Sequence, residues 1–379
     1  MPEADLRVAV NAVSIAPGGG MVVLLGLLQG WREIDAAIDP TVFASRRAVL
    51  DAVTEACPSV SVEPFAEGQG SMAHFYQQQV CLGPLLASRG FDAVLSTNVL
   101  VGRCCLPQVV HHQNLKRFKY RSVFGHLVRK QPAETIKDAF ARRALRFDHH
   151  NAFISDYLRR EAEKLVPASA GRNHVVHNGV PGHLVEAARR ASTDPDASTY
   201  HITAIQGGAA HKDNPTLIRC FARVVQEQPD HDWRMTVAGD GAMTRVRQLA
   251  EELGVASRIT FPGYLSHEEL DPLLRRSLCL VFTSVLEGFG NPPLEAMARR
   301  CPVVAADCTA IPEVVGNAGL LAPPGDADAF AAAVLRLSSD LTLRQELIDR
   351  GVRRIEQFKW ENSARKLARL LHEAVEDHP

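Results

Sequence analysis

Short apolar runs alternate with longer amphipathic stretches along most of this chain, and the alternation begins twice. The apolar runs are rich in β-branched residues, which is typical of strands that are buried on both faces of a parallel sheet. The stretches between them carry apolar residues at the spacing of a helix with one buried face. This order predicts an α/β fold with helices on both faces of parallel sheets.

The first series of elements occupies the first half of the chain. A helix is expected at Met21–Trp31 and another at Tyr157–Leu165, with a long basic helical region at Phe118–Phe147. Short strands are expected at Leu6–Val13, Thr41–Phe43, Val60–Val62, Ala93–Leu95, Gln108–Val110, Asn151–Ser155 and His174–Val176.

The second series follows a polar connector at about residues 191–199, which is rich in residues that favour turns. We therefore predict one domain at 1–190 and a second at 191–359, followed by an amphipathic helix at Trp360–Glu376. Strands of the second domain are expected at Ile202–Ile205, Met235–Ala238, Ile259–Phe261, Cys279–Phe282 and Val303–Ala306.

Composition narrows the class of protein. The chain has 379 residues, 42 Lys and Arg against 43 Asp and Glu, and a formal net charge of −1. A length of this order suits two domains, and balanced charge argues against a nucleic-acid partner. The N-terminus has no signal-peptide pattern, no apolar run could span a membrane, and the eight cysteines form no C-x-x-C. These features predict a cytoplasmic enzyme with reduced thiols.

The segment 281–316 carries the most specific chemistry. An apolar strand is followed by Gly288-Phe289-Gly290, by Pro292-Pro293 at the start of a helix, and by the strand at Val303. A helix that begins after a glycine turn at the carboxyl end of a strand is suited to binding an anion. Glu287 and Glu295 flank this turn with seven residues between them. An anion site beside two acids suits a nucleotide sugar, which carries both phosphates and hydroxyls.

This segment resembles the retaining GT-B glycosyltransferases of family 4, whose signature is two glutamates at this spacing. The matching strings are Glu-Gly-Phe-Gly, Leu-Glu-Ala-Met-Ala, Pro-Val-Val and Ile-Pro-Glu-Val-Val-Gly. The resemblance implies two Rossmann-like, doubly wound domains that face an interdomain cleft, with the helix of residues 360–379 crossing back to the first domain. It also implies transfer of a sugar from a UDP- or GDP-sugar to an acceptor hydroxyl, with retention of configuration and without a metal or cofactor.

The resemblance assigns donor-binding roles in the second domain. Lys212 matches a lysine that faces the donor diphosphate, whereas Gly208 stands where the family usually has an arginine. Glu295 resembles the glutamate that binds the ribose hydroxyls, and Glu287 the one that contacts the sugar ring. Further candidates around the nucleotide are Gly239, Tyr264, Leu265, Phe289, Gly290 and Asn291.

The first domain is expected to bind the acceptor. Gly18-Gly19-Gly20 resembles the first glycine loop of the family, so Gly19 and Gly20 are candidate ligand contacts. His111 and His112 follow a strand, where many members have a histidine that faces the reacting sugar. Because adjacent strand residues point to opposite faces, only one of them can face the ligand; we favour His112, and both stay candidates. The candidate catalytic set is therefore His111, His112, Lys212 and Glu287.

Several other patterns have a second interpretation. The D-x-D strings at Asp194 and Asp326 lie in a connector and a turn, so we expect solvated acids there, and no metal is expected at His149-His150. The basic stretch Lys116–Arg146 suits either peripheral contact with an anionic membrane at the inner face or a solvated helical face. The expected acceptor is a sugar, a lipid-linked glycan or a polysaccharide. Rival functions are a nucleotide-sugar epimerase of the same fold and a degenerate nucleotide-binding protein.

Overall fold

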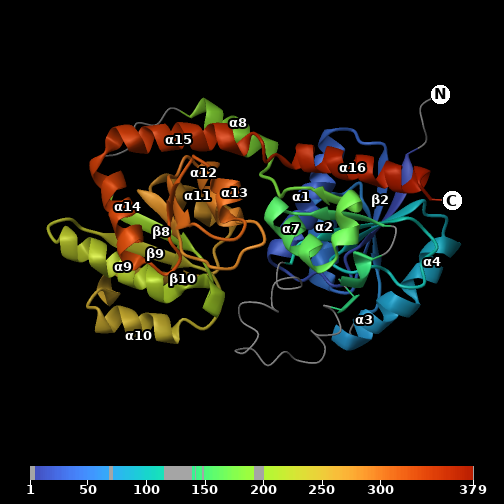
Figure 1. The fold of residues 1–379 in the computed structure, drawn as a ribbon, viewed down its shortest axis with the longest axis horizontal. Helices are drawn as coiled ribbons and strands as arrows, with labels where there is room; N and C mark the ends of the chain where they lie inside the picture. The colour runs from blue at the N-terminus through green and yellow to red at the C-terminus, as the bar shows by residue number, and fades with distance from the viewer. Residues whose placement is uncertain are drawn as a thin grey trace. The chain divides into compact units, whose positions relative to one another are not determined.

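The computed structural model divides the chain into two compact units, which we describe separately. Unit 1 comprises Met1–Gly179 together with Phe358–Pro379, and unit 2 comprises Val180–Gln357 (Figure 1). The structure describes residues 5–67, 71–114, 139–140, 142–146, 149–191 and 200–378.

Unit 1 is built on a seven-stranded parallel sheet with the order β3-β2-β1-β4-β5-β6-β7 (Figure 1). Its strands are β1 (Leu6–Asn11), β2 (Ile38–Ala44), β3 (Ser61–Pro64), β4 (Ala93–Thr97), β5 (Gln108–His112), β6 (His150–Phe153) and β7 (Asn173–Val175). Its helices are α1 (Gly19–Glu33), α2 (Arg47–Ala56), α3 (Ser71–Val80), α4 (Leu82–Ser88), α7 (Asp156–Leu165) and α16 (Trp360–Glu376).

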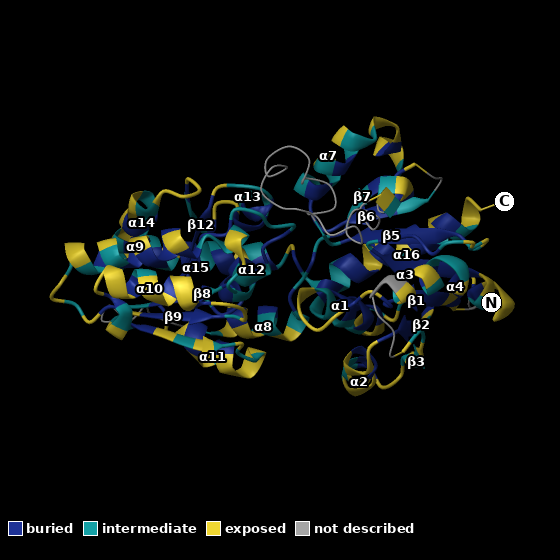
Figure 2. Ribbon diagram, turned by 90° about the horizontal axis from the view of Figure 1, so that it is seen from below, coloured by how far each residue is buried: buried dark blue, intermediate teal, exposed yellow. Residues whose placement is uncertain are grey.

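Alternate residues of β1 enter separate apolar cores on the two faces of this sheet. Val8 and Val10 belong to the core that includes residues of α1, α2 and α16, whereas Ala9 packs with Leu82 and Leu86 of α4. Figure 2 shows the strands as buried and the outer faces of the helices as exposed. The continuous apolar runs of the sequence therefore become strands that are covered on both faces.

The C-terminal helix α16 is an integral part of unit 1, because it packs against α1. Gly26 lies directly under the indole ring of Trp360, and a Cβ at this position would overlap that ring. One turn later, Gly30 lies against the Trp360 carbonyl, and Nε1–H of Trp31 donates to the Ala364 carbonyl at 3.0 Å. The expected return of this helix to the first domain is confirmed.

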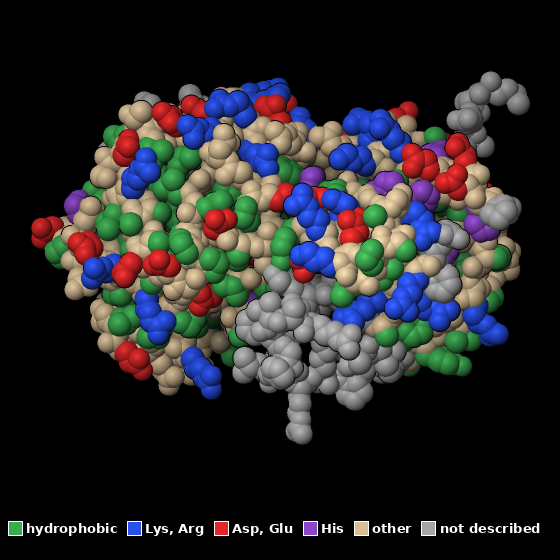
Figure 3. Space-filling model, in the orientation of Figure 1, with side chains coloured by type: hydrophobic (Ala, Val, Ile, Leu, Met, Phe, Trp, Pro, Cys, Tyr) green, Lys and Arg blue, Asp and Glu red, His purple; other side chains and the backbone are tan. Residues whose placement is uncertain are grey.

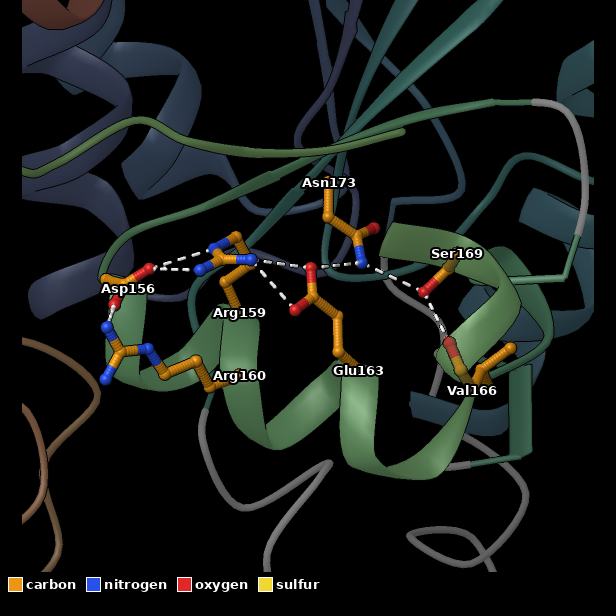
Figure 4. A network of polar contacts seen from close by, with 7 residues as sticks. All are labelled: Asp156, Arg159, Arg160, Glu163, Val166, Ser169 and Asn173. Carbon is orange, nitrogen blue, oxygen red and sulfur yellow. Dashed lines mark hydrogen bonds and ion pairs between the residues drawn. The ribbon is translucent and has the colours of Figure 1, made fainter. Parts of the chain in front are cut away.

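A polar network fixes α7 beside β7 in unit 1 (Figure 4). Ser155 caps the helix by accepting from the Leu158 amide. Arg159 then bridges Asp156 and Glu163, at 2.6 and 2.8 Å. The remaining contacts in Figure 4 join Arg160 to Asp156, Asn173 to Glu163 and Ser169, and the Ser169 hydroxyl to the Val166 carbonyl. These bonds connect α7 with the first residue of β7, so we give them a structural role in unit 1.

Unit 2 has a six-stranded parallel sheet with the doubly wound order β10-β9-β8-β11-β12-β13. Its strands are β8 (His201–Ile205), β9 (Arg234–Ala238), β10 (Ile259–Gly263), β11 (Cys279–Phe282), β12 (Val303–Ala306) and β13 (Leu320–Ala322). Its helices are α8 (Gly182–Arg190), α9 (Asn214–Glu227), α10 (Thr244–Glu252), α11 (His267–Arg275), α12 (Asn291–Met297), α13 (Ile311–Val315), α14 (Ala327–Ser339) and α15 (Leu341–Ile355).

Three local features differ from the sequence prediction. The structure adds the short edge strand β13, whose three residues give too little periodicity to be detected. Gly19 and Gly20, expected in a turn, already form the first residues of α1. The chain leaves unit 1 at Gly179, before α8, rather than at residue 190, and α8 packs with α15 in unit 2.

Charged side chains of both signs are interspersed over much of the face seen in Figure 3. This distribution agrees with the balanced composition of the chain. Of the helices in the described ranges, none is both long enough and apolar enough to cross a bilayer. The connector at 192–199, with its D-x-D string, lies outside the described residues.

Candidate functional site

In unit 2 the loops after β8 and β11 lie side by side, because these strands are neighbours where the strand order reverses. Such a switch point at the carboxyl ends of parallel strands is where ligands bind in doubly wound folds. Several hydrogen bonds join the two loops. The Thr283 hydroxyl lies 3.0 Å from the Lys212 carbonyl, and both the Ser284 hydroxyl and the Val285 amide bond to the His211 carbonyl.

Lys212 and Glu287 meet at this junction. Nζ of Lys212 lies 2.7 Å from Oε1 of Glu287, and the two side chains are 20% and 17% exposed. The ammonium group also lies 5.4 Å from the centroid of the Phe282 ring. The Glu287 amide donates to the Thr309 hydroxyl at 3.3 Å, which anchors the acid from a third loop. The structure thus brings together two of the predicted catalytic side chains, 75 residues apart in the chain.

Gly208 is held by close backbone packing. Its amide donates to the Asp240 carbonyl at 2.9 Å. A Cβ at position 208 would lie 2.5 Å from the Ala242 carbonyl oxygen, which is closer than real Cβ contacts. Gly239, with φ +143°, is packed in the same way against the Gln206 carbonyl. The loops after β8 and β9 therefore interlock through glycines, and the position of the family's arginine has no room for a side chain.

The turn after Glu287 leads directly into α12. Gly290 has φ +123°, a conformation that favours glycine, and precedes Asn291 at the first position of the helix. Phe289 is buried at 3% exposure, so only its backbone is placed to contact a ligand. The helix is only seven residues long. Its amino end is therefore a weaker anion site than a long helix would provide.

Glu295 is half-buried on the second turn of α12. Burial raises the pKa of its carboxyl, and the positive charges of His267 and Arg299 oppose that shift. Glu295 thus lies in an environment where its ionisation depends on neighbouring cations.

The two candidate residues after β10 differ in where their side chains lie. Leu265 packs against the apolar cluster of Ala238, Leu270 and Leu273. Tyr264 is 69% exposed, which is unusual for a large aromatic side chain. Of the pair, Tyr264 has the side chain that is free of the core.

The glycine loop of unit 1 is open to approach. Among the described residues, a Cβ on Gly18 or Gly19 would meet no atom within 4 Å, and one on Gly20 would meet Oε1 of Gln113 at 3.5 Å. Gly18 has φ +123° and its carbonyl accepts from the amides of Met21 and Val22, which starts α1.

His111 and His112 lie on opposite faces of the sheet, as alternation requires. Nδ1 of His111 is 3.3 Å from Nε2 of Gln113, the residue beside the glycine loop. Nε2 of His112 is 2.9 Å from the Asn151 amide oxygen, and its ring stacks on Phe153. Burial lowers the pKa of both histidines to about 4. His111 is therefore the one that the structure connects to the glycine loop.

Sequence reasoning missed Gln113 and Asn98. The Gln113 amide donates to Oδ1 of Asn98 at 2.7 Å, and the Asn98 amide donates to the His111 carbonyl at 2.9 Å. Asn98 has φ +63°, a conformation that asparagine tolerates better than most residues. An asparagine directly after a buried strand is the signal that could have indicated it.

The remaining candidates have structural partners or lie outside the description. Asp326 caps α14 by accepting from the Ala329 amide at 2.9 Å, and His150 pairs with His174 at 3.3 Å. Within the described ranges, no group of three or more potential ligands could hold a metal ion. Most of the basic stretch Lys116–Arg146 lies outside the described residues.

Comparison with solved structures places the whole chain in a two-domain class. It matches a sucrose-phosphate synthase from Thermosynechococcus elongatus with a TM-score of 0.77, 19% identity and coverage of 97% of this chain and 98% of that chain. WaaG, a glycosyltransferase involved in lipopolysaccharide biosynthesis, matches with a TM-score of 0.71 and 15% identity over 96% and 99% of the two chains. These likenesses establish the fold, and the predicted two-domain GT-B architecture is confirmed.

The sequence itself matches within unit 2. Residues 202–340 match the family model for glycosyl transferases group 1. Over 115 residues the chain is 42% identical to the O-antigen chain mannosyltransferase B of Escherichia coli, covering 30% of each protein. Over 132 residues it is 36% identical to an MMP alpha-(1->4)-mannosyltransferase of Mycolicibacterium hassiacum, covering 34% of this chain and 32% of that one.

These matches confirm the resemblance to group 1 glycosyltransferases over residues 202–340. The chain matches only about 30% of the length of these two relatives. Their activities are therefore a basis for a proposal about this protein.

Proposed function

We propose that this protein transfers a sugar from a nucleotide-diphosphate sugar to an acceptor hydroxyl, with retention of configuration and without a metal. The observation that carries the proposal is the 2.7 Å pair of Lys212 and Glu287 at the switch point of unit 2. A cation and a carboxylate beside each other suit a ligand in which a phosphate adjoins a sugar with hydroxyls. Glu295, on the helix that follows, supplies a second carboxylate for the ribose diol.

Lys212 is the group that acts on the leaving phosphate in this proposal. Cleavage of the bond between the donor sugar and its phosphate builds negative charge on that phosphate. A fixed cation therefore stabilises the transition state more than the ground state. The leaving phosphate then takes the proton of the acceptor hydroxyl, so the step needs no separate protein base. Because position 208 cannot hold an arginine, Lys212 bears more of this charge.

Unit 1 binds the acceptor through the glycine loop and the residues after β5. The open space at Gly18 and Gly19 allows a hydroxylated ligand to reach backbone amides. His111 is neutral at physiological pH, because burial lowers its pKa to about 4. It therefore orients a sugar through hydrogen bonds, with Gln113 holding the ring, and does not act as a cation.

The relatives suggest which sugar to test first. Two are named as mannosyltransferases, and one of these as an O-antigen chain enzyme. We therefore propose a mannosyl donor, and an acceptor that is a growing polysaccharide or lipid-linked glycan. A thermal-shift comparison of UDP, GDP, ADP and their sugars would identify the nucleotide base of the donor, because stabilisation grows with the ratio of ligand concentration to Kd.

Replacing either member of the ion pair tests the mechanism. We expect Lys212→Met to lower kcat by roughly 10²- to 10³-fold, because the charge on the leaving phosphate loses its fixed cation. Glu287→Gln is expected to lower kcat/KM through lost sugar contacts. Arg350→Met removes a cation of α15 that pairs with Glu346 at the surface, and it should leave both constants within about twofold.

Product analysis separates transfer from the rival chemistry. Transfer predicts a product only when both donor and acceptor are supplied. Stoichiometric epimer formation from the nucleotide sugar alone would establish an epimerase instead. Nucleotide binding with no turnover of any donor, in a protein where both ion-pair residues are intact, would indicate a degenerate enzyme.

We also propose that the basic stretch Lys116–Arg146 contacts an anionic membrane, because ten Lys and Arg side chains are interleaved there with aromatic and aliphatic residues. Co-sedimentation with phosphatidylglycerol vesicles, lost at high salt and absent with phosphatidylcholine vesicles, is the expected result. Equal recovery with both vesicles would favour a solvated helical face.

A further inference from the structure

Arg299 is a buried cation beside the proposed nucleotide site, yet it belongs to none of the ligand contacts above. Its side chain is only 2% exposed. A buried guanidinium is costly unless hydrogen bonds and opposite charges compensate it. The groups that surround it therefore indicate what it does.

Two groups hold the Arg299 side chain. Nη1 donates to the Glu295 carbonyl at 3.1 Å, and Nε lies 3.3 Å from Oδ1 of Asp271 on α11. Asp271 is itself fixed by Arg275, whose Nε lies 2.7 Å from its second oxygen. The guanidinium is thus held between the backbone of Glu295 and an acid that a second arginine positions.

The end of α12 explains why the side chain reaches back to Glu295. Arg300 adopts φ +59°, and the amides of Arg300 and Cys301 donate to the Met297 and Ala296 carbonyls. This is the hydrogen-bond pattern of a helix that stops at a left-handed residue. The Arg299 amide likewise turns to Ala296, at 2.9 Å, and the Arg299 side chain serves the Glu295 carbonyl.

The same cation acts on the Glu295 carboxyl. Burial raises the pKa of this group, and the charges of His267 and Arg299 lower it. His267 is exposed, whereas the Arg299 side chain is buried, and a guanidinium stays charged. The other charged residues on α11, α13 and α15, the helices around α12, are Glu268, Glu269, Asp271, Arg275, Glu313, Arg344, Glu346, Asp349, Arg350, Arg353 and Arg354.

We propose that Arg299 is a positioning residue, which holds Glu295 through its backbone carbonyl so that the Glu295 carboxylate can accept hydrogen bonds from the ribose hydroxyls of the donor. This inference rests on the proposed function, in which Glu295 binds the ribose. A charged acceptor binds a hydroxyl roughly twice as strongly as a neutral one. Loss of Arg299 should therefore weaken recognition of the ribose, and more so as pH falls.

The test compares each ribonucleotide with its 2′-deoxy analogue. Kd values of UDP, 2′-deoxy-UDP, GDP and 2′-deoxy-GDP are measured by calorimetry at several pH values across the range in which the protein stays folded. The ratio of deoxy to ribo Kd reports the diol contact. The titration of the diphosphate cancels in this ratio, because both ligands carry the same phosphates.

For the wild-type protein we expect a preference for the ribonucleotide across this range. In Arg299→Met the preference should be closest to that of the wild type at the highest pH measured and should fall several-fold as the pH decreases, because the pKa of the Glu295 carboxyl rises further without the cation. Arg299→Lys keeps the charge and should restore much of the wild-type profile. Arg350→Met, which removes a cation of α15 and leaves Arg299 in place, should follow the wild-type profile.

The outcomes separate this inference from the proposed function. If Glu295→Gln abolishes the ribose preference but Arg299→Met and Arg299→Lys show the wild-type pH profile, the role of Arg299 is wrong and the donor site stands. If Glu295→Gln leaves the preference unchanged, the ribose assignment itself fails. A loss of affinity in Arg299→Met that is equal at every pH would indicate a merely structural residue. Should Arg299→Met fail to fold, the pH dependence of the Kd ratio is compared between Arg299→Lys and Glu295→Gln, and this comparison decides between the outcomes.

Discussion

At the scale of the residue, position 208 shows how a glycine can decide the chemistry of a neighbouring lysine. The sequence indicates only that an arginine is replaced. In the structure the Gly208 amide bonds to Asp240, and the Ala242 carbonyl occupies the space that a side chain would need. The interlocked loops therefore exclude a second cation, and Lys212 with Glu287 is the charged pair that the strand ends present.

We predict that Gly208→Ala destabilises the protein by about 1–3 kcal/mol, because the added methyl group must displace backbone atoms. Gly208→Arg should be at least as harmful and should not raise activity. The measurement is the urea midpoint of unfolding. Ala209→Ser at the exposed neighbouring position is the control and should be close to neutral. A stable, more active Gly208→Arg variant would contradict the packing argument.

At the scale of the element, most strands were predictable from local pattern, and α16 was predicted with its observed bounds. Burial on both faces makes each strand a continuous apolar run, which is a local signal. The edge strand β13 lacked that signal because it is short and only half-buried at two of its three positions. The packing of α16 on α1 has no such local signal, because it depends on a contact between Gly26 and Trp360, which is far away in the sequence.

We predict that Gly26→Ala destabilises unit 1 by roughly 1–3 kcal/mol through overpacking against the Trp360 ring. Thermal unfolding followed by tryptophan fluorescence reports the change, because Trp31 and Trp360 both lie in this contact. Gly171→Ala is the matched control, since a Cβ there meets no atom of the described part of the chain within 4 Å. An equal effect of the two substitutions would mean that the packing of α16 on α1 does not stabilise unit 1.

At the scale of the whole molecule, buried neutral histidines link stability to pH in both units. Burial lowers the pKa of His111 and His112 in unit 1, and of His201 in unit 2, to about 4. In the unfolded chain a histidine has a pKa near 6.5, so the unfolded state binds more protons between about pH 6.5 and about pH 4. Stability is therefore complete above about pH 6.5 and is lost as pH falls through this window.

We predict that the free energy of unfolding decreases steadily from about pH 7 to about pH 4.5. For each histidine that is neutral only in the folded state, the loss is on the order of 1.4 kcal/mol when the pH falls by about one within this window. Denaturant titrations at several pH values measure the slope. His201 bonds to the hydroxyls of Ser277 and Thr236, and His201→Gln should reduce the slope without changing nucleotide affinity. A slope of zero would show that these histidines are not neutral in the folded protein.

Local patterns in the chain were enough to specify the α/β class and the two series of elements, because periodicity and turn chemistry depend on near neighbours. The candidate side chains Lys212, Glu287 and Glu295 came from the resemblance of their segments to a known family. Which side chains meet was settled only by folding. The approach of Ala242 to Gly208, of Gln113 to His111, and of Asp271 to Arg299 brings together separate loops and helices. Such contacts arise from three-dimensional packing, which no short pattern of apolar and polar positions encodes.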